Sequence, residues 1–95
     1  MARLKEIIES RERCSESGWH AYDFILDEPL TDEEIKGLRL ENSSFVYLKS
    51  RKKPFFKIES NHIVIKGVST DSFFRVAIHD DYRELLDTVK EKLKH

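Results

Sequence analysis

The sequence predicts an α+β domain in which helices pack mainly on one face of an antiparallel sheet. Residues 19–79 contain several short segments of alternating apolar residues, and the turns between most of them are short. Strands joined by short turns pair in antiparallel fashion. Segments with helical spacing precede and follow this region. We therefore expect the order α-β-α-β-β-β-β-α around a four- to five-stranded sheet.

The N-terminal residues 2–16 are expected to form a helix. Leu4, Ile7 and Ile8 recur at the spacing of one helical face, and Gly18 follows shortly after the expected end. The apolar stripe is thin, which indicates a helix at an edge of the domain.

A strand and a short helix are expected next. Residues 19–26 (WHAYDFIL) are rich in aromatic side chains, as is typical of a strand. The helix over residues 32–38 is indicated by Thr31 and Glu34, which have the spacing of a capping box. The carboxylates of its first turn favour the positive end of the helix dipole.

Four more strands and a final helix complete the expected fold. The strands are placed at residues 44–50, 55–60, 62–67 and 73–79. The helix over residues 81–94 has apolar residues at helical spacing and lysines in its last turn.

Length and charge limit the function. Residues 1–95 are expected to form one domain. The chain has 17 basic and 18 acidic residues and a net charge of −1, so it lacks the basic character of most nucleic-acid-binding domains. Any such binding has to come from local segregation of charge. Cys14 is the one cysteine, which fits a reducing compartment. Without a signal peptide or a membrane-spanning segment, the protein is expected in the cytoplasm, without membrane association.

No motif for catalysis, a cofactor or a metal is found, so we expect neither an enzyme nor a bound cofactor or metal. The four histidines lack the spacing of metal ligands. His62 and His79 are positioned to be diagonal neighbours on adjacent strands, but two exposed histidines on a sheet are the favoured interpretation. The acidic run at residues 27–34 is attributed to helix capping.

Alternation along the strands separates two sheet faces. One is uniformly apolar and is expected to be the core face beneath the helices: Val46, Leu48, Phe56, Ile58, Ile63, Ile65, Phe74, Val76 and Ile78. The other mixes aromatic and basic residues and continues into the basic segment 49–57 (KSRKKPFFK). Single-stranded nucleic acid is held by aromatic rings that stack on bases and by cations that meet phosphates. The candidate stacking residues are Phe45, Tyr47, Phe55 and Phe73, and the candidate phosphate contacts are Lys49, Arg51, Lys52, Lys53, Lys57, Lys66 and Arg75.

The same face also fits roles that involve no nucleic acid. The N-terminal helix or a second copy of the chain would cover the aromatic residues, and a charged hairpin tip protects a sheet edge from unwanted pairing. The sequence therefore allows single-stranded nucleic acid or DNA, another protein, a second copy of the chain or a small ligand as the partner.

Residues 45–67 (FVYLKSRKKPFFKIESNHIVIKG) resemble one half-repeat of the TATA-binding protein fold. An apolar strand ends in basic residues, a proline-containing turn leads to a second apolar strand, and a short polar turn leads to a third. A strand and a helix precede this segment and a helix follows, as in that fold. The resemblance implies a sheet face that contacts a partner, which is DNA in that family. Only one half is present, and residues 72–79 and 2–16 are additions, so no DNA-reading residue is carried over.

Overall fold

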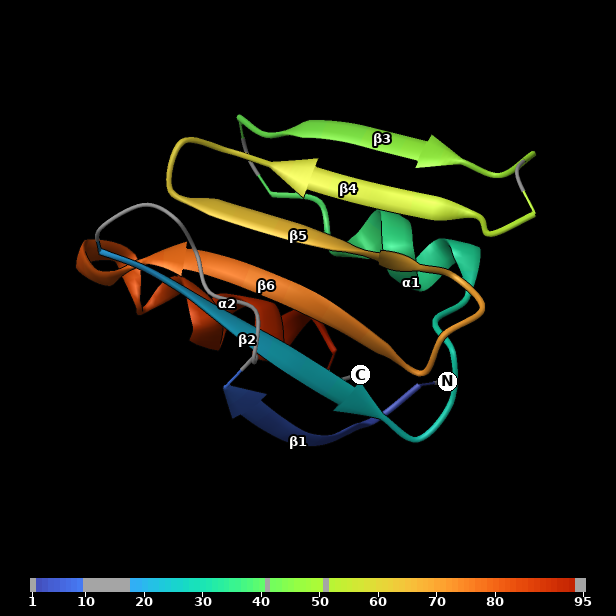
Figure 1. Cartoon of the computed structure of the whole chain (residues 1–95), viewed down its shortest axis with the longest axis horizontal. Helices are drawn as coiled ribbons and strands as arrows, with labels where there is room; N and C mark the ends of the chain where they lie inside the picture. The colour runs from blue at the N-terminus through green and yellow to red at the C-terminus, as the bar shows by residue number, and fades with distance from the viewer. Residues whose placement is uncertain (1, 10–17, 41, 51, 94–95) are drawn as a thin grey trace.

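A computed structural model describes residues 2–9, 18–40, 42–50 and 52–93 (Figure 1). Six antiparallel strands form one open sheet, accompanied by two short helices in the order β-β-α-β-β-β-β-α. The strands are β1 (Leu4–Glu9), β2 (Trp19–Leu26), β3 (Ser44–Leu48), β4 (Phe55–Glu59), β5 (Ile63–Val68) and β6 (Phe73–His79). The helices are α1 (Asp32–Gly37) and α2 (Leu85–Lys92), and a 3₁₀ turn (Asp80–Tyr82) precedes α2.

The spatial order of the strands is β1-β2-β6-β5-β4-β3. From β3 to β6 the chain forms a meander, and β6 returns to pair with β2 along its whole length. Consequently β1 and β3 are the two edges of the sheet. Figure 1 shows both helices on the same side of the sheet, behind it in that view.

The core lies between this side of the sheet and the two helices. The sheet contributes aromatic and β-branched side chains, while α1 contributes Ile35 and α2 contributes Val89, both of which are fully buried. Burial of such side chains supplies most of the favourable free energy of folding. The fully buried sheet residues are Phe24, Phe56, Ile58, Ile63, Ile65, Phe74, Val76 and Ile78.

The predicted N-terminal helix is wrong. Residues 4–9 form strand β1, while residues 10–16 lie outside the described part of the chain. Leu4 is opposite Leu26 and Ile7 is opposite Phe24, and the register shifts between Leu4 and Glu6. A β-bulge inserts one residue and so brings side chains three apart onto the same face. This bulge explains why the apolar spacing resembled that of a helix.

Because β1 joins the sheet, the sheet has six strands instead of four to five, and the order begins with a strand instead of a helix. The bounds of β2 and β6 agree with the predictions, and those of β4 and β5 agree within one residue. The strand predicted at residues 44–50 is shorter in the structure, because β3 ends at Leu48.

The short helix α1 confirms the predicted capping box. Thr31 Oγ1 accepts a hydrogen bond from the Glu34 backbone N–H at 3.2 Å, and Glu34 Oε1 accepts one from the Thr31 N–H at 3.0 Å. The second carboxylate oxygen of Glu34 accepts from the backbone N–H of Ala2 at 3.0 Å. The cap of α1 thus also fixes the chain just before β1.

The C-terminal helix begins later than predicted. The His79 side chain accepts a hydrogen bond from the Asp81 N–H and caps a 3₁₀ turn, so α2 starts at Leu85 instead of residue 81. Within the described ranges, neither helix has the length and apolar character that a membrane span requires.

Candidate binding face

The face of the sheet away from the two helices is termed the outer face. Its most distinctive feature is a row of three cations on adjacent strands. Lys57 of β4 lies directly opposite Lys66 of β5, and Lys66 lies directly opposite Arg75 of β6. Neighbouring strands are about 4.8 Å apart, and like charges placed opposite each other destabilise a sheet. Folding therefore places repelling charges side by side on an open face.

The charges of the row are compensated only in part. Arg75 Nε donates to Asp23 Oδ1 at 2.9 Å, and the two side chains are 26% and 17% exposed. Lys57 Nζ lies 3.6 Å from Glu59 Oε2 in a more exposed pair, which contributes little stability. Lys66, in the middle, is exposed and forms no ion pair with any residue in the described ranges.

An apolar row runs beside the cations. On β3, β4 and β5 it consists of Leu48, Phe55 and Val68, which are opposite one another. On β6 and β2 it continues with Phe73 opposite Ile25. The row therefore combines two aromatic rings with aliphatic side chains and crosses the sheet parallel to the cations.

Three large apolar side chains of the outer face are exposed to an unusual degree. Ile8 of β1 is 44% exposed, Val46 of β3 is 43% exposed and Phe73 of β6 is 38% exposed. Their register partners Asp23, Lys57 and Ile25 place all three on the outer face. Among the residues that the structure describes, these are the large apolar side chains with the greatest exposure. Ile8 and Val46 are on the two opposite edge strands and Phe73 is on an inner strand, so the three exposed apolar side chains are spread across the outer face.

The predicted facing of β3 is wrong. Phe45 is opposite Ile58 and Tyr47 is opposite Phe56, so both aromatic side chains lie on the helix side and pack against the core. Val46 and Leu48, predicted for the core, lie on the outer face instead. All four residues are apolar, so alternation alone could not determine which pair faces inward; the pairing with β4 sets this register.

Lys49 belongs to the helix side as well. Its Nζ lies 2.8 Å from Asp32 Oδ2, while Tyr47 Oη donates to Asp32 Oδ1 at 2.6 Å. The hydrogen bond from Lys49 lowers the pKa of Asp32, and the bond from Tyr47 lowers it further. The same bond to Asp32 raises the pKa of Lys49. Burial raises the pKa of Tyr47, and its bond to Asp32 adds to the effect.

The structure thus brings five of the predicted binding residues together on the outer face: Phe55, Lys57, Lys66, Phe73 and Arg75. Lys52 and Lys53 lie exposed in the turn between β3 and β4, at one edge of the sheet. Arg51 lies outside the described residues. Phe45, Tyr47 and Lys49 are not on this face.

The outer face also has residues that the sequence-based prediction missed. Trp19 of β2 is opposite His79 of β6. Their rings are arranged edge to face, with the ring centres 5.9 Å apart. The second missed residue is Asp23. Its pairing with Arg75 could not be predicted, because it requires β6 to lie beside β2. Only the sheet order shows that relation, since the two residues are 52 positions apart in the sequence.

His62 and His79 are neighbours through their backbones, because the His79 N–H donates to the His62 carbonyl at 3.1 Å. Both rings contact Tyr82: the His62 ring stacks on it at 3.7 Å, and the His79 ring meets it edge-on at 6.2 Å. Across the described ranges, no three side chains of the types that hold metal ions gather in one place.

No protein-family model matches the chain, and no curated protein and no solved structure matches it. Conclusions about its function therefore depend on the geometry of the chain itself.

Proposed function

We propose that the outer face binds single-stranded nucleic acid and that the protein is a small, non-catalytic binding module. The observation that carries this proposal is the row Lys57, Lys66 and Arg75 on an open sheet face, beside the rings of Phe55 and Phe73. Phosphates placed along the row would relieve the repulsion between its cations. Bases stacked on the neighbouring rings would contribute about 1–3 kcal/mol each.

The surroundings of the row support the same partner. Lys52 and Lys53, exposed in the β3–β4 turn, extend the basic character beyond the first residue of β4. The resemblance of residues 45–67 to a half-repeat of the TATA-binding protein fold points in this direction too, because the sheet face contacts DNA in that family. A cytoplasmic location remains a prediction from the sequence.

The test is an amide NMR titration with a short single-stranded DNA of mixed sequence. We expect the largest shift changes at Lys57, Lys66 and Phe73. Replacing Lys66→Gln removes one charge-assisted contact and should weaken binding about tenfold. Lys36→Gln is the matched control, because Lys36 lies exposed on α1, on the other side of the sheet. Equal effects of the two substitutions, or no shift changes at all, would contradict the proposal.

A second candidate is association with another protein or with a second copy of the chain. It is favoured by the exposure of Ile8, Val46 and Phe73 on the same face. Burial of apolar side chains depends weakly on salt but strongly on protein concentration. Self-association is supported if sedimentation shows a mass that rises with protein concentration and if the Phe73→Ser variant has the mass of a monomer. A monomer at all concentrations excludes the second copy.

A further inference from the structure

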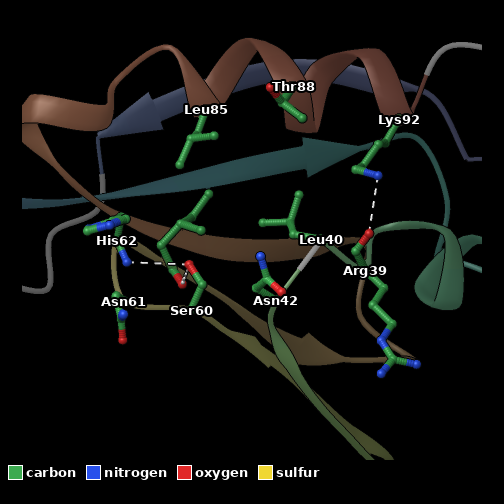
Figure 2. A pocket seen from close by; sticks show the side chains of 10 residues that line it. Arg39, Leu40, Asn42, Ser60, Asn61, His62, Leu85, Thr88 and Lys92 are labelled. Carbon is green, nitrogen blue, oxygen red and sulfur yellow. Dashed lines mark hydrogen bonds between the residues drawn. The ribbon is translucent and has the colours of Figure 1, made fainter.

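A groove of about 570 Å³ lies apart from the outer face, where α2 meets the turn between β4 and β5 (Figure 2). Three segments line it. Leu85, Thr88 and Lys92 come from α2, and the connection between α1 and β3 contributes Arg39, Leu40 and Asn42. The β4–β5 turn contributes residues 60–62, and β5 contributes its first residue, Ile63. Its volume is within the range of pockets that hold small molecules.

The lining combines an apolar part with basic residues. Leu40, Ile63 and Leu85 provide aliphatic surface, while Arg39 and Lys92 are cationic. Neither aspartate nor glutamate is among the ten described residues that line the groove. Among the residues that the structure describes, a ligand in this groove would therefore meet positive charge without a neighbouring carboxylate; Glu41 lies outside the described residues.

Lys92 is placed to hold an anion at one end of the groove. Its Nζ donates to the carbonyl oxygen of Arg39 at 3.2 Å, which fixes the ammonium group between α2 and the α1–β3 connection (Figure 2). An ammonium group has three donors and only one is used in this bond. The other two N–H groups are available to a ligand.

Two further polar side chains of the groove have no hydrogen-bond partner among the residues that the structure describes. The ring nitrogens of His62 and the side-chain amide of Asn42 form no hydrogen bond with any residue that the structure describes. Stacking on Tyr82 fixes the plane of the His62 ring. Figure 2 shows the Asn42 amide in the space between α2 and the β4–β5 turn, and the Arg39 guanidinium turned away from α2.

We propose that this groove binds a small organic monocarboxylate with an apolar body. The carboxylate would accept hydrogen bonds from Lys92 and Asn42, and the body would lie on Leu40, Ile63 and Leu85. One fixed ammonium group matches a single negative charge. The Arg39 guanidinium lies 5.8 Å from the centre of the Phe45 ring, so the groove lacks the bidentate fork with which arginine binds phosphate.

The probes are benzoate and its neutral analogue benzyl alcohol, each titrated at millimolar concentration and followed by amide NMR. We expect benzoate to shift the resonances of residues 39–42, 60–63 and 85–92, and to bind about tenfold more tightly than benzyl alcohol, because a hydrogen bond to a charged group is the stronger kind. Equal affinity of the two probes, or an absence of shift changes in these segments, would overturn the proposal.

Two substitutions locate the contact. Lys92→Gln should reduce the affinity for benzoate to that for benzyl alcohol, whereas Lys90→Gln, on the same helix but outside the lining, should leave it unchanged. Asn42→Gly removes the amide but keeps the backbone, since Asn42 has φ of 57°, a conformation that glycine adopts freely. It should weaken benzoate binding without unfolding the protein.

If Lys90→Gln weakens binding as much as Lys92→Gln, the assignment is wrong. Lys66→Gln, on the outer face, should leave the affinity for benzoate unchanged.

Discussion

At the scale of single residues, Gly67 is where the sheet leaves no room for a side chain. A β-carbon there would lie 3.0 Å from the Phe56 ring and 3.0 Å from the Phe74 Cβ, on the core face between β4 and β6. We predict that Gly67→Ala destabilises the protein by about 1–3 kcal/mol, the range for overpacked cores. Gly37→Ala is the control, because a β-carbon at Gly37 meets nothing within 4 Å. At this helical position alanine should stabilise by up to about 1 kcal/mol. Urea unfolding measures the change in the free energy of unfolding for both variants. A change of the same sign for both would contradict the predicted crowding at Gly67.

The cluster of Asp32, Tyr47 and Lys49 makes part of the stability depend on pH. The folded pKa of Asp32 lies below its ordinary value of 3.8, so its contribution is present above pH 3.8 and is lost as the pH falls through the folded value. We predict that Asp32→Asn is less stable than the parent at neutral pH and that the difference narrows below pH 3.8. The carboxylate is exposed, so added salt should reduce the difference. A difference that is constant over the acid range in urea titrations would argue against this role.

At the scale of elements, β1 offers a direct test of strand against helix. In the strand, Ile7 packs toward the core opposite Phe24, and Ile8 points to the outer face opposite Asp23. We predict that Ile7→Ala costs about 1–2 kcal/mol, below the range for a fully buried site because Ile7 is only partly buried. Ile8→Ala should cost less than about 0.5 kcal/mol. A helix with both residues on one face would give similar losses, and unfolding experiments on the two variants distinguish these cases.

Elements that depend on contacts between residues close in the sequence were predicted well, and elements that depend on a neighbouring strand were not. The capping box of α1 is a contact between residues three apart, and it was predicted correctly. The cations Lys57, Lys66 and Arg75 each follow a fully buried apolar residue on their strand, so their face was predicted correctly too. In β1 a bulge imitated helical spacing, and in β3 a run of apolar residues left the facing undetermined. Both of these features are set by the neighbouring strand.

At the scale of the whole molecule, the candidate site likewise has features that follow from the local sequence and features that depend on how the strands pair. Composition and alternation indicated that one sheet face would be basic and aromatic. They did not indicate that Lys57, Lys66 and Arg75 would lie directly opposite one another, because that depends on the register of three strands. They also did not indicate the groove, whose lining comes from three segments that meet only through the packing of α2.

The whole chain has a net charge of −1, so attraction of a nucleic acid has to come from the local row of cations. If each cation of the row meets one phosphate, the logarithm of the affinity for single-stranded DNA should fall with the logarithm of salt concentration with a slope of about −2, at about −0.7 for each phosphate. Lys66→Gln should reduce the magnitude of this slope by about 0.7, whereas Lys36→Gln should leave it unchanged. Fluorescence anisotropy over a range of salt concentrations measures the slope. A slope near zero would mean that phosphates are not the contacts, and the exposed apolar residues of the outer face would then indicate a protein partner instead.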